Sequence, residues 1–339
     1  MERGALNNAS SPVDVVSTSA SALGESPLWH PGLRCLLWVD IVGKRLHRLD
    51  PASGDESHWT LPEEPGCIGL VAAAADGPGR ATPSDEEPAA RSDRLVIALR
   101  SGFHQLDWRD DSASGIVLRR LTPPLFDTAR YRFNDGKVDP SGRFWAGTLF
   151  EPKTVADAGL YCLERGVARP VTGAGTADSP GREWGVTTSN GLAFSPDGRL
   201  MYHSDTPAHV VYVHDIDPVS GRPLNRRVWW RTPDDKTAPD YAGRPDGAAV
   251  DVAGCYWTAL FEGGRIAQIS PSGELLQTVV VPARCPTMVA FGGPDRRTLY
   301  VTSARHGRSD VELDRLPLSG RVFALRVPVA GLPPNLYRP

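Results

Sequence analysis

The sequence lacks long apolar runs, charge blocks and a secretory signal. Although 40 % of its 339 residues are hydrophobic, they fall in short runs, so no segment approaches the roughly 18 apolar residues of a membrane-spanning helix. Residues 1–20 hold no apolar signal core, which predicts a cytoplasmic protein. The net charge of −3 is evenly spread, so neither nucleic acid nor a membrane surface is an expected partner.

Cysteine is scarce as well, and its spacing excludes the common cysteine-based sites. The chain has five cysteines, an odd number, and no two form a C-x-x-C pair. We therefore expect buried thiols in a reducing compartment, without disulfides or a zinc site. The positions are Cys35, Cys67, Cys162, Cys255 and Cys285.

Helical periodicity is nearly absent, and a short alternating segment returns six times instead, at intervals of about 55 residues. The copies begin at Leu46, Phe103, Leu160, Val211, Ile266 and Val322. A second apolar segment precedes each copy, and several of these follow turn residues such as Asp139-Pro140-Ser141-Gly142. Six equal units of alternating strands predict an all-β, six-bladed β-propeller of four-stranded antiparallel blades.

The repeats also predict the domain organisation. We expect one propeller domain over residues 13–330, in which residues 13–16 could supply the outer strand of the last blade. Residues 1–12 are expected to form a disordered tail and residues 331–339 a C-terminal tail. Residues 76–94, rich in Gly, Pro, Ala, Ser and charge, indicate a flexible insertion loop, either a surface insertion or a lid.

Four of the units carry an oxygen-bearing side chain five residues before their turn. These residues are Glu25, Asn134, Asn190 and Asp246. Equivalent positions of a propeller are related by its axis, so these side chains should converge at the mouth of the central channel. In the other two units the position falls near Gly69 and Thr287, where the alignment is loose.

This set of side chains predicts a metal site. Two carboxylates with amide oxygens suit Ca²⁺, Mg²⁺ or Mn²⁺, and the lack of His and Cys argues against a dedicated zinc site, although Zn²⁺ could still bind. The alternative is that the Asn-Gly and Asp-Gly pairs only form turns. Their common register in four units favours a site.

The same residues carry a family likeness. The stretch 132–143, RFNDGKVDPSGR, strongly resembles the gluconolactonase family that includes regucalcin, the senescence marker protein. Further similar motifs occur at 23–27, 189–192, 245–247 and 300–305. The likeness extends from about Gly24 to Phe323, with the motifs in the family's order.

The resemblance implies a function and a set of roles. It implies metal-dependent hydrolysis of a sugar (aldono)lactone to the aldonic acid, with one divalent ion held by Glu25, Asn190 and Asp246. Asp246 would also be the acid/base, and Arg132 and Asn134 would contact the substrate. Where regucalcin-type members carry a substrate-contacting Glu, this chain has Pro152, and the adjacent Glu151 could substitute for it.

Other functions remain open at this point. An esterase or phosphotriesterase could use the same metal site, and a non-enzymatic calcium-binding regulatory propeller is a third possibility. No Gly-x-Ser-x-Gly motif indicates a serine hydrolase. We expect a small-molecule sugar lactone as the partner and a monomer or weak homodimer. Trp38, Trp145 and Trp257 occupy matching strand positions, which favours packing within the sheets over sugar stacking.

Overall fold

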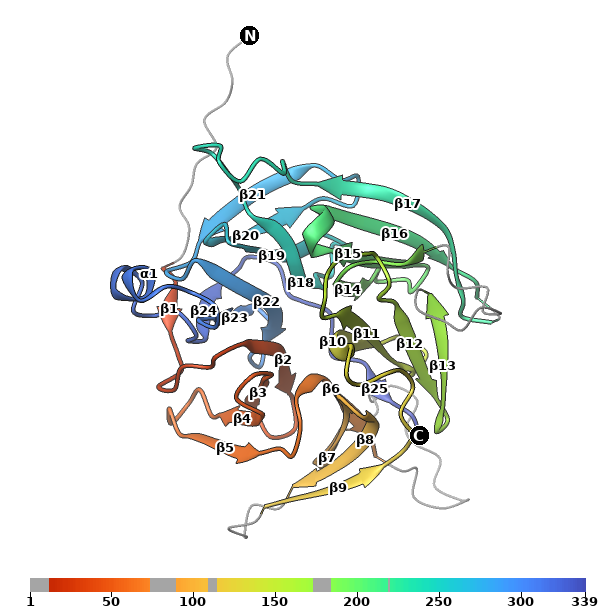
Figure 1. Cartoon of the computed structure of the whole chain (residues 1–339). Helices are drawn as coiled ribbons and strands as arrows, with labels where there is room; N and C mark the ends of the chain where they lie inside the picture. The colour runs from red at the N-terminus through yellow and green to blue at the C-terminus, as the bar shows by residue number, and fades with distance from the viewer. Residues whose placement is uncertain (1–11, 74–89, 109–114, 173–183, 219) are drawn as a thin grey trace.

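The computed structural model describes residues 12–73, 90–108, 115–172, 184–218 and 220–339. They form six sheets, or blades, around one axis (Figure 1), and the four principal strands of each blade are antiparallel. Blade 1 consists of β2 (Gly24–His30), β3 (Cys35–Asp40), β4 (Arg45–Leu49) and β5 (Glu56–Thr60). Blade 2 contains β6 (Pro65–Ala72), β7 (Ala90–Leu99), β8 (Gly102–Trp108) and β9 (Ile116–Arg120). Blade 3 consists of β10 (Tyr131–Val138), β11 (Phe144–Phe150), β12 (Leu160–Glu164) and β13 (Val167–Thr172).

The second half of the chain repeats this order. Blade 4 consists of β14 (Ser189–Phe194), β15 (Leu200–Asp205), β16 (Val210–Ile216) and β17 (Pro223–Arg231). Blade 5 consists of β18 (Arg244–Val250), β19 (Tyr256–Phe261), β20 (Arg265–Ile269) and β21 (Leu275–Val280). Blade 6 is built from β22 (Cys285–Gly292), β23 (Thr298–Ala304), β24 (Phe323–Arg326) and β1 (Asp14–Val15). The predicted all-β six-bladed propeller is confirmed.

Both chain ends pair with distant strands. In blade 6, β1 lies antiparallel to β24, with Asp14 opposite Ala324, so residues 13–16 supply the outer strand as expected. Residues 331–339 include a short strand, β25 (Leu336–Tyr337), which pairs parallel with β6 and gives blade 2 a fifth strand. Residues 1–11 of the tail expected over 1–12, and residues 76–89 of the loop expected over 76–94, lie outside the described residues. Residues 90–94 of that expected loop are part of strand β7.

Burial decreases from the axis outward within each blade. The innermost strands, such as β14 and β22, are buried along their whole length, whereas β5 and β9 at the rim are largely exposed. Inner strands are therefore covered on both faces by neighbouring blades, which requires small and apolar side chains there. Figure 1 shows the inner strand of each blade beside the central axis. Equivalent positions of a propeller are related by this axis, so the N-terminal ends of the six inner strands lie at the same mouth of the channel.

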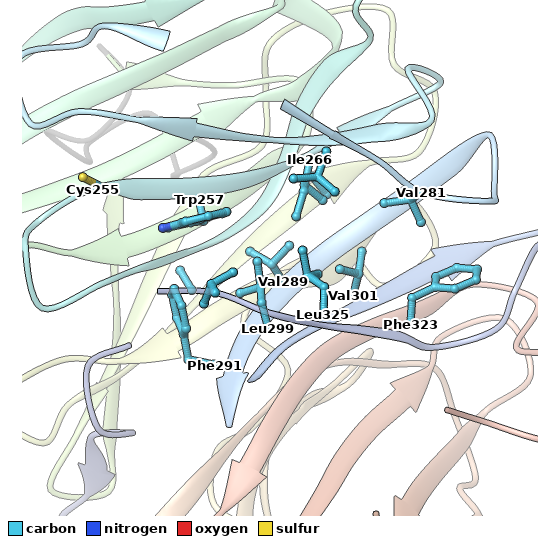
Figure 2. Close-up of a cluster of buried hydrophobic side chains, with 14 of the residues drawn as sticks. Cys255, Trp257, Ile266, Val281, Val289, Phe291, Leu299, Val301, Phe323 and Leu325 are labelled. Atoms are coloured by element: carbon cyan, nitrogen blue, oxygen red, sulfur yellow. The ribbon is translucent and has the colours of Figure 1, made fainter. Parts of the chain in front are cut away.

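Apolar side chains fill the space between adjacent blades. Figure 2 shows Trp257 and Ile266 of blade 5 meeting Val289, Leu299 and Leu325 of blade 6 in one buried cluster. Burying a side chain of this size contributes about 1.5–3 kcal/mol relative to leaving it exposed. The contacts between blades therefore hold the ring together without covalent cross-links.

The three tryptophans at matching positions pack inside the sheets, as the sequence indicated. Trp38, Trp145 and Trp257 are fully buried. The indole Nε1 of Trp145 donates to Asp139 Oδ2, and that of Trp257 to Asp251 Oδ2, both at 2.9 Å. Each bond ties a strand to the turn that precedes it.

The cysteines and the small helical content also fit a protein built from β-sheets. All five cysteine side chains are buried, and no disulfide joins any two of them. One short α-helix, α1 (Asp310–Arg315), follows its N-cap residue Ser309. In the part of the chain that the structure describes, no helix combines the length and apolar character needed to cross a membrane.

Candidate metal and active site at the channel mouth

Each inner strand is interrupted by a β-bulge near its N-terminal end. The register shifts fall between the pairs Glu25/Leu28, Pro65/Cys67, Phe133/Gly136, Asn190/Ala193, Pro245/Ala248 and Pro286/Met288. A bulge redirects the side chains of its strand and ends regular pairing. The four residues selected from the repeats thus lie at or inside these bulges.

The bulges also show which residues of the other two units occupy the position equivalent to Glu25, Asn134, Asn190 and Asp246. Thr287 lies in the bulge of β22, as the repeats suggested. In β6 the bulge falls at Gly66, and the expected Gly69 is regularly paired with Val96. A Cβ atom on Gly66 would lie 2.6 Å from the carbonyl carbon of Phe133, so only glycine fits this approach to blade 3.

Three of the predicted residues are in direct contact. Arg132 Nη1 donates to Asn134 Oδ1 at 2.7 Å, and Asn134 Nδ2 donates to Asn190 Oδ1 at 2.6 Å. Asn190 is held from its other side, because its Nδ2 donates to Thr206 Oγ1 at 2.7 Å. The carbonyl oxygen of Asn190 retains a second lone pair for a further partner.

The two predicted carboxylates lie on the inner strands of blades 1 and 5. Glu25 and Asp246 are only 5 % and 4 % exposed. Burial raises the pKa of Glu25 well above its usual range, and the charges of Asp246 and Asp135 raise it further. Burial also raises the pKa of Asp246, with a further contribution from the charge of Asp135. The two acids are therefore close enough to repel each other.

The oxygen atoms of these side chains are suitable ligands for a divalent cation. Asp246 Oδ1 is buried and has no hydrogen-bond partner among the described residues, and Glu25 accepts a bond from its own neighbour, Ser26 N, at 3.3 Å. Buried charges in proteins are normally paired or bound to a metal. No cluster of three or more His, Cys, Asp or Glu suited to a metal occurs in the described part of the chain. The candidate set instead combines two carboxylates with the amide of Asn190.

Asp135 is a further buried acid at this site, which the repeat positions do not single out. Its Oδ1 accepts from Gly136 N at 2.6 Å, and its Oδ2 accepts from Leu192 N of blade 4 at 2.9 Å. Burial raises its pKa to about 6, and the neighbouring Lys137 opposes the shift. Asp135 thus holds the backbone beside Asn190 from the adjacent blade, a role that depends on the bulge of β10.

Glu151 lies at the same mouth but is already paired. Its Oε1 accepts from Arg100 Nη2 at 2.7 Å, and this bond lowers the pKa of Glu151 below its usual range. The charge of Arg132 acts in the same direction. The structure brings Glu151 into the electrostatic surroundings of Arg132 and joins it directly to Arg100.

The chain is similar to known proteins over nearly its whole length. Residues 23–305 match the model of the SMP-30/Gluconolactonase/LRE-like region. The chain is 44 % identical over 317 residues to a 6-deoxy-6-sulfogluconolactonase of Pseudomonas putida, covering 94 % of this chain and 95 % of that protein. It is 33 % identical to regucalcin of Danio rerio, covering 96 % and 98 % of the two chains.

A solved structure shares the fold. The calcium-binding protein regucalcin of Agrobacterium tumefaciens superposes with a TM-score of 0.81 at 25 % sequence identity, over 97 % of this chain and 98 % of that one. The resemblance noted in the sequence motifs is confirmed over nearly the whole chain. This protein belongs to the SMP-30/gluconolactonase/LRE-like family, as the family model and its relatives show.

Proposed function

We propose that this enzyme is a metal-dependent sugar lactonase. Glu25, Asn190 and Asp246 would hold one divalent ion, which is Ca²⁺, Mg²⁺, Mn²⁺ or Zn²⁺, and Asp246 would be the acid/base. The observation that carries the proposal is the buried Asp246 Oδ1, which has no hydrogen-bond partner within the described ranges and lies near a second buried acid, Glu25. Matches to lactonases across the whole chain support the reaction class.

The reaction requires a water molecule, a polarised carbonyl and a proton carrier. A divalent cation bound by these residues supplies Lewis-acid polarisation of a carbonyl oxygen. In the proposed reaction the water oxygen attacks the lactone carbonyl carbon while the carboxylate of Asp246 accepts a proton from the water. The bond between that carbon and the ring oxygen then breaks. Asp246 returns the proton to the ring oxygen, which leaves the hydroxyl of the aldonic acid.

Arg132 and Asn134 would orient the sugar. The guanidinium of Arg132 reaches Asn134 Oδ1 through one of its nitrogen atoms, so its other N–H groups remain for substrate hydroxyls. Holding the lactone beside the acid/base lowers the entropic part of the barrier. Glu151 is a further candidate for substrate contact, although both of its carboxylate oxygens already accept from Arg100, Oε1 at 2.7 Å and Oε2 at 3.2 Å. A substrate hydroxyl would have to use their remaining lone pairs.

The name of the Pseudomonas putida relative indicates which sugar to test first. That protein is a lactonase of 6-deoxy-6-sulfogluconolactone by name. We propose this lactone and the uncharged gluconolactone as candidate substrates.

A calcium-binding regulatory role is the second candidate function, which the matches to regucalcin favour. A phosphotriesterase or other esterase activity on the same site is the third.

The test is hydrolysis of a panel of five- and six-membered aldonolactones by metal-stripped protein. Mg²⁺, Ca²⁺, Mn²⁺ or Zn²⁺ is added back, and Asp246→Ala is compared with Asp314→Ala, which changes an exposed acid on α1. Turnover that requires metal and is lost only in Asp246→Ala supports the proposal. Metal binding without acceleration of any lactone over buffer would refute it and favour the regulatory or esterase alternatives.

We also propose a cytoplasmic location and a monomeric or weakly dimeric state. The buried thiols agree with a reducing, cytoplasmic environment, where disulfides are rare. A monomer or weak homodimer is expected in solution, and light scattering after size-exclusion chromatography would measure it.

A further inference from the structure

The central channel holds a cavity below the proposed metal site, on the side away from the mouth. Its volume is about 290 Å³, and the inner strands of all six blades line it. Most of the lining is apolar, with one such residue from each blade being Leu28, Ile68, Val138, Ala193, Val250 and Met288. Each of them lies at or beyond the bulge of its strand, so the cavity is deeper in the channel than the metal site.

A segment near the C-terminus closes this cavity on its outer side. The segment is 332–335, Leu-Pro-Pro-Asn, and all four residues line the cavity. Leu332 N donates to Val250 O at 3.3 Å, and Asn335 Nδ2 donates to Val138 O at 3.0 Å. The two prolines and Asn335 also line a hollow at the surface. The closing segment is therefore one chain thick, and it must move for a ligand to enter from this side.

One charged side chain, that of Lys137, lines the cavity among the residues that the structure describes. Lys137 lies on β10 in blade 3, and its Nζ donates to Ala248 O on β18 in blade 5 at 2.7 Å. Since blade 4 lies between these blades along the ring, the lysine side chain crosses part of the channel. Ala248 follows Asp246 by two residues, so the ammonium lies just below the metal site, at the top of the cavity.

This ammonium has unused hydrogen-bond donors. A lysine can donate three hydrogen bonds, and only the bond to Ala248 is formed within the described ranges. Both carboxylate oxygens of the neighbouring Asp135 accept backbone N–H groups instead, and no Asp or Glu is among the described residues of the lining. Burial lowers the pKa of Lys137, and the charge of Asp135 opposes the shift. Because buried charges in proteins are normally paired, an anion inside the cavity would complete this environment.

We propose that the cavity binds a small apolar monoanion, a carboxylate with an aromatic or branched hydrocarbon body, whose oxygens accept from Lys137 Nζ. An apolar cavity of about 150 Å³ binds one benzene ring, so the present volume accommodates a body of about two rings. The apolar walls favour a hydrocarbon over a sugar, and the ammonium favours a carboxylate over a neutral ligand. This site is separate from that for the lactone, and the inference does not depend on the proposed function.

The experiment uses 2-naphthoate, a two-ring carboxylate, and 2-naphthamide, its uncharged analogue. Calorimetry measures the affinity of each for the whole chain in EDTA, so that the carboxylate cannot bind a metal ion at the mouth. Lys137→Met removes the charge, whereas Ala249→Leu and Ala290→Leu each add apolar volume to the lining, on blades 5 and 6. Lys44→Met is the matched control, because Lys44 lies in the turn after β3 and does not line the cavity.

We expect the wild type to bind 2-naphthoate more tightly than 2-naphthamide. Lys137→Met should weaken the binding of 2-naphthoate about 10–100-fold, as for the loss of one charge-assisted hydrogen bond, and should change the binding of the amide by less than about threefold. Ala249→Leu and Ala290→Leu should weaken the binding of both ligands because less space remains. Lys44→Met should bind both ligands as the wild type does.

Three results would overturn the inference. They are no binding of 2-naphthoate to the wild type, an unchanged affinity in Lys137→Met, and an unchanged affinity in Ala249→Leu and Ala290→Leu. Replacing a buried charge by an apolar side chain of similar volume is often neutral for stability, so Lys137→Met should fold, which circular dichroism would verify. If it does not fold, the two leucine variants still decide whether the ligand occupies the cavity. Since no measurement here requires lactone hydrolysis, failure of the lactonase proposal would leave this inference intact.

Discussion

Replacing Asp246 by asparagine should stabilise the metal-free protein while removing its response to metal. Asp246 is a buried acid whose Oδ1 lacks a hydrogen-bond partner among the described residues, and the charges of Glu25 and Asp135 are close to it. Asparagine has nearly the same shape but carries no charge. Its amide can also donate to a neighbouring carboxylate.

The expected size follows from the cost of an unsatisfied buried group, about 1–3 kcal/mol. A chain of this length unfolds with an entropy of roughly 0.7 kcal/mol/K, so the Tm should rise by about 1.5–4 °C in the presence of a chelator. Metal at a hundred times its Kd should add about 2.7 kcal/mol to the stability of the wild type. The variant should gain little from the same addition.

The control is Asp251→Asn, five residues further along the chain. Asp251 is also fully buried, but its carboxylate accepts from Ala253 N, Cys255 N and Trp257 Nε1. An asparagine amide there would place an N–H donor against other N–H donors. The free energy of unfolding of this variant should therefore fall by about 2 kcal/mol with or without metal. Thermal unfolding with EDTA and with Ca²⁺ measures all three proteins. If Asp246→Asn is destabilised in EDTA as much as Asp251→Asn, Asp246 is a structural residue and the reasoning is refuted.

Three further changes test other parts of the structure. Burial lowers the pKa of His214 to about 3, so between pH 7 and 5 the unfolded chain binds a proton that the folded chain does not. When the pH falls from 7 to 5, the free energy of unfolding of the His214→Phe variant should therefore decrease by about 2 kcal/mol less than that of the wild type. Equal decreases, measured by urea unfolding, would contradict this prediction. Gly191→Ala should lower the Tm, because Gly191 has a φ of +59° and a Cβ would lie 2.9 Å from the carbonyl oxygen of Asp246; an unchanged Tm would exclude this crowding. Arg132→Lys should lower kcat/KM for any lactone substrate about 10-fold or more, because lysine lacks the planar set of N–H donors, and unchanged kinetics would remove Arg132 from the site.

Much of the fold could be predicted from the sequence because a propeller repeats one local pattern. The turns that begin at Asp139 and Asp251 recur at the same place in their units, and each is fixed by bonds within a few residues. Residues related by the repeat must face the same axis. Glu25, Asn134, Asn190 and Asp246 could therefore be selected before their contacts were known.

The remaining features depend on contacts between blades, which a local pattern does not contain. The inward position of Asp135 requires the bulge of β10 and the backbone of Leu192 on the next blade. The pairing of Glu151 with Arg100 joins loops of blades 2 and 3. No spacing along the chain encodes these juxtapositions.

The closure of the ring has a consequence for protein synthesis. Asp14 pairs with Ala324, and Leu336 pairs with Leu70, so both closing contacts join segments that are made far apart in time. Domains fold as units during translation at about 5–20 residues per second, and such long-range contacts form late. The first strand must wait with its edge unpaired until β24 has left the ribosome. The nascent chain thus exposes an open ring for most of its synthesis, and this interval is when it is most prone to misassembly and most in need of chaperones.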